Sequence, residues 1–307
     1  MTLRPSTTAE LGTMVREAHD RHAALRIAAR GTWPGRTDAV ARDATTVDVS
    51  ALSGIVEYVP GDLTLTARAG TTIAEVDAVT GAHGQWCPLL PWGGDEGSLG
   101  ATFATATQGP CCASLGAPRD IAIGLEFVDG TGAVVRAGGR VVKNVAGFDL
   151  TRLLVGSWGT LGVVTEVSVR LRARPAVDES WSVALDLGDA STASRVDEFR
   201  RGPLAPLAIE ALGDAVARDL GLGAPDRLLV RLGGNAAFVA ASRQALRSFG
   251  HADACDSGIW TRLRAMDPKP RAPLGASALA DPLSRRVKKQ FDPRHIMNPG
   301  IFGEARA

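Results

Sequence analysis

Cysteine is scarce in this sequence, which limits the kinds of site that the chain can build. The 307 residues include four cysteines, Cys87, Cys111, Cys112 and Cys255. They form no C-x-x-C pair and no cysteine–histidine set at the spacing of metal ligands. We therefore expect no iron–sulfur cluster and no metal site, and we interpret the four thiols as buried or incidental.

An excess of either charge is also missing. The chain has 34 Lys and Arg against 33 Asp and Glu, a formal net charge of +1, and no basic run long enough to follow a nucleic-acid backbone. The first 20 residues lack the apolar core of a signal peptide, and no window approaches the roughly 20 apolar residues of a membrane span. We expect a cytoplasmic protein without a nucleic-acid partner or membrane span.

The two common nucleotide-binding motifs are absent. No G-x-x-x-x-G-K-[ST] occurs, and no G-x-G-x-x-G opens a helix after the first strand. These absences exclude P-loop and Rossmann sites. Glycine, in contrast, is abundant: 35 of 307 residues, against an average near 7%. The excess lies mainly between Gly81 and Gly162, where backbone amides have room to converge on a ligand.

Hydrophobic periodicity and turn residues predict a mixed first half. The pattern favours helices over 7–22, 72–82 and 150–155, and strands over 25–29, 46–49, 55–59, 63–69 and 162–172. A two-residue turn at Asp129-Gly130 predicts a hairpin over 121–137. Residues 85–120 have little charge and many turn residues, so we expect a buried irregular region.

The pattern changes after Pro175, where glycine becomes less frequent. Strands near 181–187 and 228–232 and helices through Val196 and over 236–249 predict an α+β unit of roughly 100 residues. Residues 268–280 have the composition of a Pro/Ala linker, and 282–290 favours a helix. The apolar content of 45% is sufficient for a buried core.

Four stretches carry a family resemblance, in the family's order: RGTWPGRTD from Arg30, GSLGATFATATQGP from Gly97, the block from Gly116 to Pro175, and FDPRHIMNPGIF from Phe291. They resemble the FAD-binding oxidases of the vanillyl-alcohol oxidase and p-cresol methylhydroxylase (PCMH) type. The part GGRVVKNVAGFDLTRLLVGSWGTLGVVTEVSVRL is most similar to FAD-binding subunits of bacterial glycolate oxidases. The resemblance covers about 25–175 and 284–302, and it does not extend to 176–280.

The resemblance implies an α+β fold with three parts. A two-subdomain PCMH-type FAD-binding domain would occupy residues 1–173, and a small α+β second domain, for substrate or partner, would occupy 174–280. The tail, 281–307, would return to the FAD domain and cover the cofactor.

It also implies that FAD is held without a covalent bond, mainly by backbone groups. The pyrophosphate loop would be Arg30, Gly31, Thr32, Trp33 and Gly35. The turn against the ribityl chain and the isoalloxazine would comprise Gly97, Ser98, Leu99, Gly100, Ala101, Ala106, Thr107 and Gly109. The first loop contains no His or Cys for covalent attachment, and we interpret Cys111 and Cys112 as packing residues.

Three further elements complete the implied site. Gly116, Arg119 and Asp120 match a G-x-x-R-D element, for which an Arg–Asp pair that closes a loop is an equal explanation. Backbone groups near Gly159, Gly162, Val163 and Val164 would face the flavin, and Asn298 of the tail would form a hydrogen bond near it. Side chains at Gly156, Gly159 and Gly162 would block the flavin. The rival explanation is a tight connection that needs positive φ.

Oxidation of a 2-hydroxy acid requires a base for the hydroxyl proton and a cation for the carboxylate. No two of the five histidines are spaced as a pair, and 176–280 holds only His251, without the histidine motif of the family's catalytic members. Arg262 and Arg264 either clamp a carboxylate or belong to a solvated face. The sequence identifies no catalytic residue.

The resemblance therefore implies an FAD-linked oxidoreductase that works as one subunit of a glycolate oxidase-like complex. Its partners would be a catalytic flavin subunit and an iron–sulfur subunit, its substrate at the level of the complex a small 2-hydroxy acid, and its location the cytoplasm or, through its partners, the inner membrane surface. Two alternatives remain open. One is a self-sufficient oxidoreductase with a substrate pocket between the FAD domain and 176–280, and the other is a non-catalytic assembly subunit.

Overall fold

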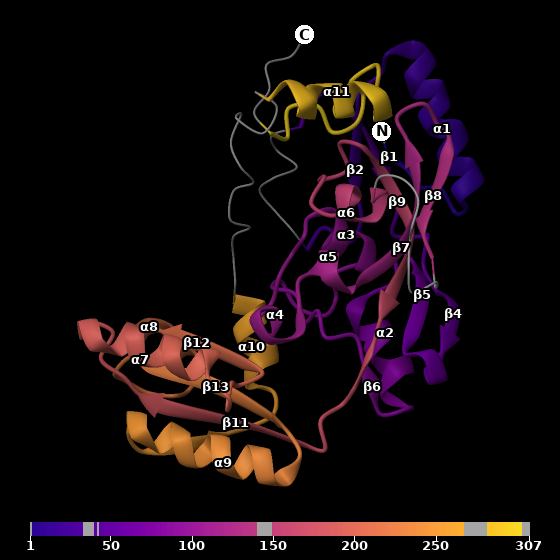
Figure 1. Cartoon of the computed structure of the whole chain (residues 1–307). Helices are drawn as coiled ribbons and strands as arrows, with labels where there is room; N and C mark the ends of the chain where they lie inside the picture. The colour runs from indigo at the N-terminus through magenta and orange to yellow at the C-terminus, as the bar shows by residue number, and fades with distance from the viewer. Residues whose placement is uncertain (1, 33–39, 42, 140–148, 267–280, 303–307) are drawn as a thin grey trace.

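The computed structural model describes residues 2–32, 40–41, 43–139, 149–266 and 281–302. The chain forms a larger unit with three sheets and a smaller unit with one sheet, joined by the segment between β10 and β11 (Figure 1). Helices and strands are mixed in both units, which confirms the expected α+β class.

The first sheet of the larger unit is parallel, in the order β1-β3-β2, with β1 at Thr2–Leu3, β2 at Leu25–Ala28 and β3 at Thr45–Asp48. Helix α1, Thr8–Arg21, begins after Thr7, whose hydroxyl accepts a hydrogen bond from the Glu10 amide. The helix buries Leu11 and Val15 in one core with Leu25 and Val47. The predicted helix and strands are confirmed, with ends shifted by one residue.

The second sheet is antiparallel, in the order β4-β5-β9-β7-β8. Its strands are β4 at Ile55–Val59, β5 at Thr64–Arg68, β7 at Ala122–Asp129, β8 at Val134–Gly138 and β9 at Gly162–Arg170. The short helix η2, Pro60–Asp62, joins β4 to β5. Helices α2, Ile73–Gly81, and α6, Leu150–Leu154, contribute Ile73, Val76 and Leu154 to the core that this sheet buries. This core positions the glycine-rich turn between α6 and β9.

Two local expectations for this unit were wrong. The hairpin from β7 to β8 is longer than a two-residue turn: Gly132, and not Gly130, has the positive φ, and Asp129 accepts from the amides of Thr131 and Ala133. The region from Gln85 to Asp120 is mostly buried or half-buried, as expected, but it contains regular elements. These are β6 at Gln85–Trp86, α3 at Leu99–Ala104, α4 at Cys112–Leu115 and α5 at Pro118–Ile121. Strand β6 pairs with β10, Arg172–Ala173.

The smaller unit is an antiparallel sheet in the order β12-β13-β11-β14. The strands are β11 at Val177–Ala184, β12 at Ala208–Leu212, β13 at Arg227–Gly234 and β14 at Ala252–Cys255. Helices α7, Ala190–Arg201, and α9, Ala236–Leu246, pack on one face, and η3, Arg247–Phe249, follows α9. The sequence pattern did not reveal β12, α8 or β14, because each is short.

The other face of this sheet packs against both its own helices and the larger unit. Helices α8, Asp214–Asp219, and α10, Ile259–Met266, lie here, and their core includes Trp86 and Cys111 of the larger unit. Arg264 of α10, 2% exposed, donates to both carboxylate oxygens of Asp95 and to the Pro91 carbonyl. A buried ion pair and a shared core therefore join the two units.

The C-terminal tail lies against the first sheet, next to strand β2 (Figure 1). Helix α11, Pro282–Phe291, precedes an extended segment in which Met297 forms a parallel bridge with Leu25 of β2. The Leu25 amide donates to the Ile296 carbonyl, and the Asn298 amide donates to the Leu25 carbonyl. The predicted linker, 268–280, lies outside the described residues.

A buried ion pair fixes this tail. Lys288 of α11 donates from Nζ to Asp292 at 2.6 Å and to the carbonyls of Thr160 and Met297, and both charged side chains are at most 4% exposed. Asp292 also accepts from the amides of Ile296 and Met297. The pair thus connects α11, the turn before β9 and the extended tail.

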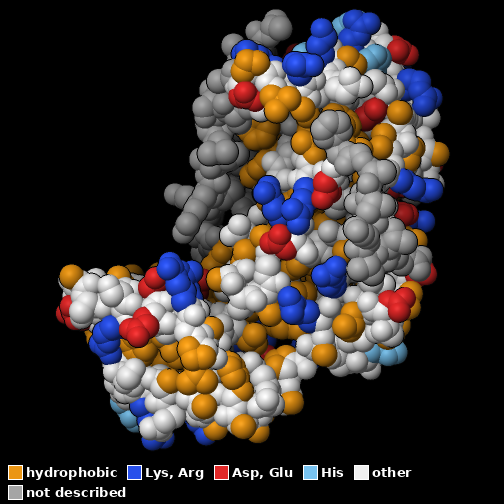
Figure 2. All heavy atoms as spheres, in the orientation of Figure 1, with side chains coloured by type: hydrophobic (Ala, Val, Ile, Leu, Met, Phe, Trp, Pro, Cys, Tyr) orange, Lys and Arg blue, Asp and Glu red, His pale blue; other side chains and the backbone are white. Residues whose placement is uncertain are grey.

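The described surface bears both charges. Figure 2 shows Lys and Arg interspersed with Asp and Glu on the face in view, as the net charge of +1 implies. Within the described ranges, no helix has the length and apolarity that a bilayer crossing requires.

We predict that Gly100→Ala destabilises the fold. Gly100 of α3 faces β5 and its following turn, and an added Cβ would lie 2.4 Å from the Cβ of Ala69. The overpacking should lower the free energy of unfolding by about 1–3 kcal/mol, measured by urea denaturation. Gly61→Ala, with no atom within 4 Å of its added Cβ, is the control. An unchanged urea midpoint in Gly100→Ala would show that α3 does not pack this closely on β5.

We also predict that Lys288→Met destabilises the protein more than Lys288→Met combined with Asp292→Asn. The single change leaves the Asp292 carboxylate buried without its cation, and loss of one partner of a buried pair costs about 3–5 kcal/mol. Urea denaturation of the two variants measures the difference. Equal urea midpoints in the single and the double variant would show that the buried Asp292 carboxylate does not depend on Lys288. Arg262→Met, which removes an exposed ion pair with Asp256, is the control and should have a small effect.

Candidate functional site

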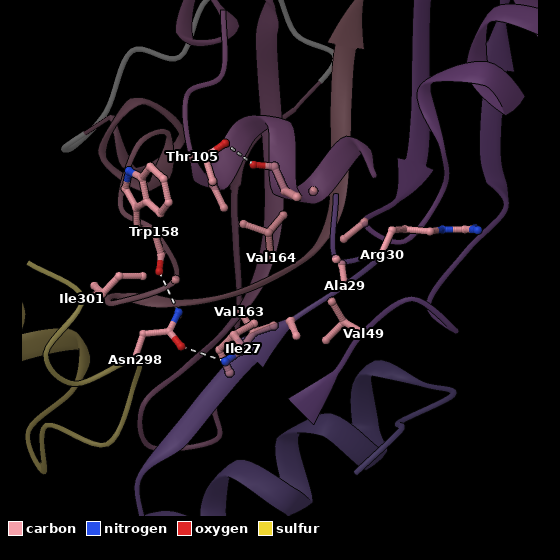
Figure 3. Close-up of a pocket in the computed structure, with 18 of the residues that line it drawn as sticks. Ile27, Ala29, Arg30, Val49, Thr105, Trp158, Val163, Val164, Asn298 and Ile301 are labelled. Carbon is pink, nitrogen blue, oxygen red and sulfur yellow. Dashed lines mark hydrogen bonds between the residues drawn. The ribbon is translucent and has the colours of Figure 1, made fainter. Parts of the chain in front are cut away.

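A cavity opens in the larger unit where the parallel sheet, α3, the start of β9 and the C-terminal tail meet (Figure 3). Its walls are mostly apolar, and many of the side chains are small. The lining residues are Ile27, Ala28, Ala29, Arg30, Gly31, Thr32, Val49, Ala69, Gly100, Ala101, Ala104, Thr105, Trp158, Gly159, Gly162, Val163, Val164, Asn298 and Ile301. The cavity thus brings together residues of both glycine-rich loops, of β9 and of the tail.

The first loop presents free backbone donors to this cavity. In the described part of the chain, no oxygen accepts a hydrogen bond from the amides of Arg30, Gly31 and Thr32. Gly31 has φ of +67° and open space around its Cα. Consecutive unpaired amides around a left-handed residue form an anion-binding concavity. The residues present therefore fit the pyrophosphate of a dinucleotide. Trp33 and Gly35, predicted for the same loop, lie outside the described residues.

The Arg30 side chain extends away from the middle of the cavity (Figure 3). Its guanidinium donates to the Gly70 carbonyl and lies 3.9 Å from the Glu75 carboxylate. Glu75 in turn accepts from Thr72 at the start of α2, and this backbone hydrogen bond lowers the pKa of its carboxyl. The loop thus offers its backbone, rather than a charged side chain, to an anion.

The protein's own packing constrains the glycines of the turn before β9 and Gly162 at the start of the strand, and the interpretation that side chains there would block the flavin stays a prediction. A Cβ at Gly162 would lie 2.7 Å from Phe127 and 2.8 Å from the Val128 carbonyl. Gly159 has φ of +69° and would meet the Asn298 amide, and Gly156 has φ of +83°. The rival explanation, a tight connection with positive φ, holds for Gly156 and Gly159.

The residues of the second predicted turn do not all line the same cavity. Gly100 and Ala101 line the cavity, while the Ser98 hydroxyl accepts from the Ala101 amide and Leu99 is fully buried in the core. A Cβ at Gly97 would lie 3.5 Å from the Thr32 hydroxyl, so this turn borders the first loop. The rest of the turn, Ala106, Thr107 and Gly109, lines a different cavity.

The G-x-x-R-D element lies outside the described cavity. Arg119 and Asp120 are exposed on α5, and the Asp120 carboxylate accepts a hydrogen bond from the Ala117 amide. Gly116, with φ of +102°, lies against the Asp120 side chain. Of the two explanations, this geometry fits the closing of a loop, although Asp120 bonds the backbone and not Arg119.

Asn298 joins the two walls of the cavity with its side-chain amide. Its Oδ1 accepts from the Ile27 amide at 2.7 Å, and its Nδ2 donates to the Trp158 carbonyl at 2.8 Å (Figure 3). Asn298 is 4% exposed and has φ of +45°, a conformation that Asn tolerates better than most residues. The tail therefore fixes the distance between β2, which leads into the first loop, and the glycine-rich turn before β9.

A second cavity lies between the two units, beside the core that joins them. It has a volume of about 1340 Å³ and lies between α4 with its preceding loop and the β12 edge of the smaller sheet. Its charged lining residues are Arg200, Arg201, Glu210 and Asp219. We call it the interdomain cleft. Thr105 and Trp158 line this cleft and the first cavity alike.

The predicted cation candidates lie elsewhere. Arg262 forms a bidentate pair with Asp256 at the surface, and Arg264 is buried with Asp95. The solvated-face explanation thus holds for Arg262 but not for Arg264, whose structural role the sequence pattern did not reveal. Among the described residues that line the two cavities there is no histidine: His251 is exposed beside Asp253, and His19 faces the Gly130 carbonyl.

The thiols are also remote from the first cavity. Cys87 and Cys111 are buried, and burial raises the pKa of the Cys87 thiol to about 12 and that of Cys111 to about 11. A thiol with so high a pKa is a poor nucleophile at neutral pH. Cys112 lines the interdomain cleft, and burial raises the pKa of its thiol as well. The buried positions of Cys87 and Cys111 agree with the expected packing role.

Comparison with known proteins agrees with this geometry. Residues 1–138 match a family model described as an FAD binding domain. The chain is 39% identical, over 160 residues, to the glycolate oxidase subunit GlcE of Escherichia coli, a match that covers 52% of this chain and 45% of that protein. The chain thus matches less than half of this relative.

Two solved structures share the fold. An alkyldihydroxyacetonephosphate synthase superposes with a TM-score of 0.78 over 97% of this chain and 76% of its own, at 14% identity. A p-cresol methylhydroxylase superposes with a TM-score of 0.67 over 94% of this chain and 63% of its own, at 13% identity. At these identities the likeness concerns the fold. The chain therefore carries an FAD binding domain, with FAD as its cofactor, in a fold of the PCMH type, and over half of its length it is similar to a glycolate oxidase subunit.

Proposed function

We propose that this chain is the FAD-binding subunit of a complex that oxidises a small 2-hydroxy acid. The observation that carries the proposal is the cavity beside the amides of Arg30, Gly31 and Thr32, which have no acceptor among the described residues, in a chain similar to a glycolate oxidase subunit over half its length. Its partners would be a catalytic flavin subunit and an iron–sulfur subunit. We place it in the cytoplasm, or at the inner membrane surface through those partners.

Each part of the cavity has a role toward FAD. The amides of the first loop, with Trp33 and Gly35, would hold the pyrophosphate. The small residues Gly100 and Ala101 of α3 and the start of β9 at Gly162, Val163 and Val164 would pack against the ribityl chain and the ring. Asn298 would keep these walls at the required separation. Gly159 and the neighbouring backbone would lie beside the ring. When bound, FAD supplies a two-electron acceptor.

The other residues of the second predicted turn would support this site without lining its cavity. They are Gly97, Ser98 and the core residue Leu99, and Ala106, Thr107 and Gly109, which line the interdomain cleft. Among the described residues that line the cavity, none is a cysteine or a histidine. A covalent bond to the flavin would require such a nucleophile, so we propose that FAD is bound non-covalently.

The proposed domain boundaries follow the sheets. Strand β10 ends the larger unit at Ala173, strand β11 begins the smaller one at Val177, and α11 begins at Pro282. We therefore propose an FAD-binding domain at 1–173, a small domain at 174–280 and a tail at 281–307.

Participation of partners is supported by the interdomain cleft. Its lining contains no histidine to accept the hydroxyl proton of a 2-hydroxy acid, and each of its two arginines, Arg200 and Arg201, pairs with Asp197 on the same helix. A partner subunit would then supply the base and the cation.

A self-sufficient oxidoreductase is the second candidate, and the same cleft favours it in one respect. Glu210 and Arg201 both line it, so a carboxylate and a guanidinium are present in a cleft that shares Thr105 and Trp158 with the FAD cavity. The two candidates differ in whether a 2-hydroxy acid reduces the flavin of the isolated chain.

We predict that glycolate does not reduce the FAD of the isolated chain but does so when the two other subunits are present. The measurement is the loss of flavin absorbance near 450 nm under anaerobic conditions, with dithionite as the control for complete reduction. Bleaching of the isolated chain at the rate of the complex would contradict the subunit proposal and favour the second candidate.

A further inference from the structure

The FAD cavity and the interdomain cleft share a wall. Of all their lining residues in the described chain, Thr105 and Trp158 are common to both. Figure 3 shows these two residues on the side of the cavity opposite Arg30. A molecule that approaches the cofactor from the cleft would therefore meet these two residues.

The cleft itself is too large to select a small substrate. Its volume of about 1340 Å³ exceeds the range of about 300–1,000 Å³ that is typical of pockets for drug-sized ligands. A short-chain 2-hydroxy acid would touch only a fraction of the lining. Selection by size would then fall to the residues that the cleft and the FAD cavity share, Thr105 and Trp158.

Of the two shared residues, Thr105 has a side chain that already forms hydrogen bonds within the protein. Its hydroxyl donates to the Ala101 carbonyl of α3 and lies within hydrogen-bond distance of the Thr107 hydroxyl. These bonds hold the short side chain against its own helix. The large side chain of the wall is Trp158.

Trp158 is held in an unusual conformation. Its φ is +54°, where bulky residues are outliers, and it stands between Gly156 and Gly159, which also have positive φ. The Trp158 amide donates to the Ala104 carbonyl at 2.7 Å, and its carbonyl accepts from Asn298. The backbone of Trp158 is thus held by hydrogen bonds on both sides, and its indole is half-buried.

Core packing does not account for this residue. None of the four hydrophobic clusters found in the described part of the chain includes Trp158, although glycine or asparagine would suit its backbone better. Strained residues that packing does not require are typical of functional sites.

We propose that Trp158 determines which molecules reach the flavin from the interdomain cleft. Its indole forms the shared wall, admits molecules of the size of a short-chain 2-hydroxy acid and excludes larger ones. This inference rests on the proposed function, since it concerns the same FAD site, and it adds the residue that sets specificity.

The test uses the full FAD-loaded chain and needs neither the substrate nor a partner. The flavin is reduced with dithionite, and its reoxidation by dioxygen, a small oxidant, and by dichlorophenolindophenol, a bulky two-ring dye, is followed by stopped flow. We expect Trp158→Gly and Trp158→Asn, both compatible with positive φ, to raise the ratio of dye rate to oxygen rate by about tenfold or more. Trp158→Phe retains an aromatic wall and should keep the wild-type ratio.

Trp92→Ala is the matched control, because Trp92 lines the cleft but not the FAD cavity. An unchanged ratio in both Trp158→Gly and Trp158→Asn, or an equal rise in Trp92→Ala, would overturn the inference. Loss of FAD from both Trp158 variants in excess FAD would also overturn it, because the indole would then hold the cofactor. A wild-type chain that binds no FAD would instead refute the proposed function, and this inference with it.

Discussion

The side-chain amide of Asn298 is the interaction on which the cavity that we propose for FAD depends. It accepts from Ile27 on β2 and donates to Trp158 in the turn before β9, so it joins the two halves of the larger unit across the cavity. The buried pair of Lys288 and Asp292 holds the tail that carries it. A residue near the C-terminus thereby fixes the space between elements from the first and the middle parts of the chain.

The glycines of this fold serve two different purposes. Gly31 has positive φ and open space beside it, as a backbone that receives a ligand requires. Gly100 and Gly162 lie so close to Ala69 and Phe127 that a side chain would collide with the protein itself. The same residue type thus leaves the backbone accessible at one loop and permits close packing at another.

Much of the fold was predictable because its strands and helices are strongly periodic. The helix over Thr8–Arg21 and the strand over Gly162–Arg170 follow directly from alternation and capping. Short elements such as β12 were not predictable, because five residues carry little local signal and the strand depends on pairing with its neighbours in the sheet. The bond from Arg264 to Asp95 joins residues 169 apart in the sequence, and no local pattern encodes such a pairing.

We propose that FAD occupies this cavity without a covalent bond and that Asn298 keeps the cavity open to it. The most direct measurement is the amount of FAD in the supernatant after acid precipitation of the purified chain and of Asn298→Ala. We expect about one FAD per wild-type chain, all of it released, and much less from the variant. Flavin that stays in the pellet, or a wild-type chain that is colourless and refuses added FAD, would contradict the account.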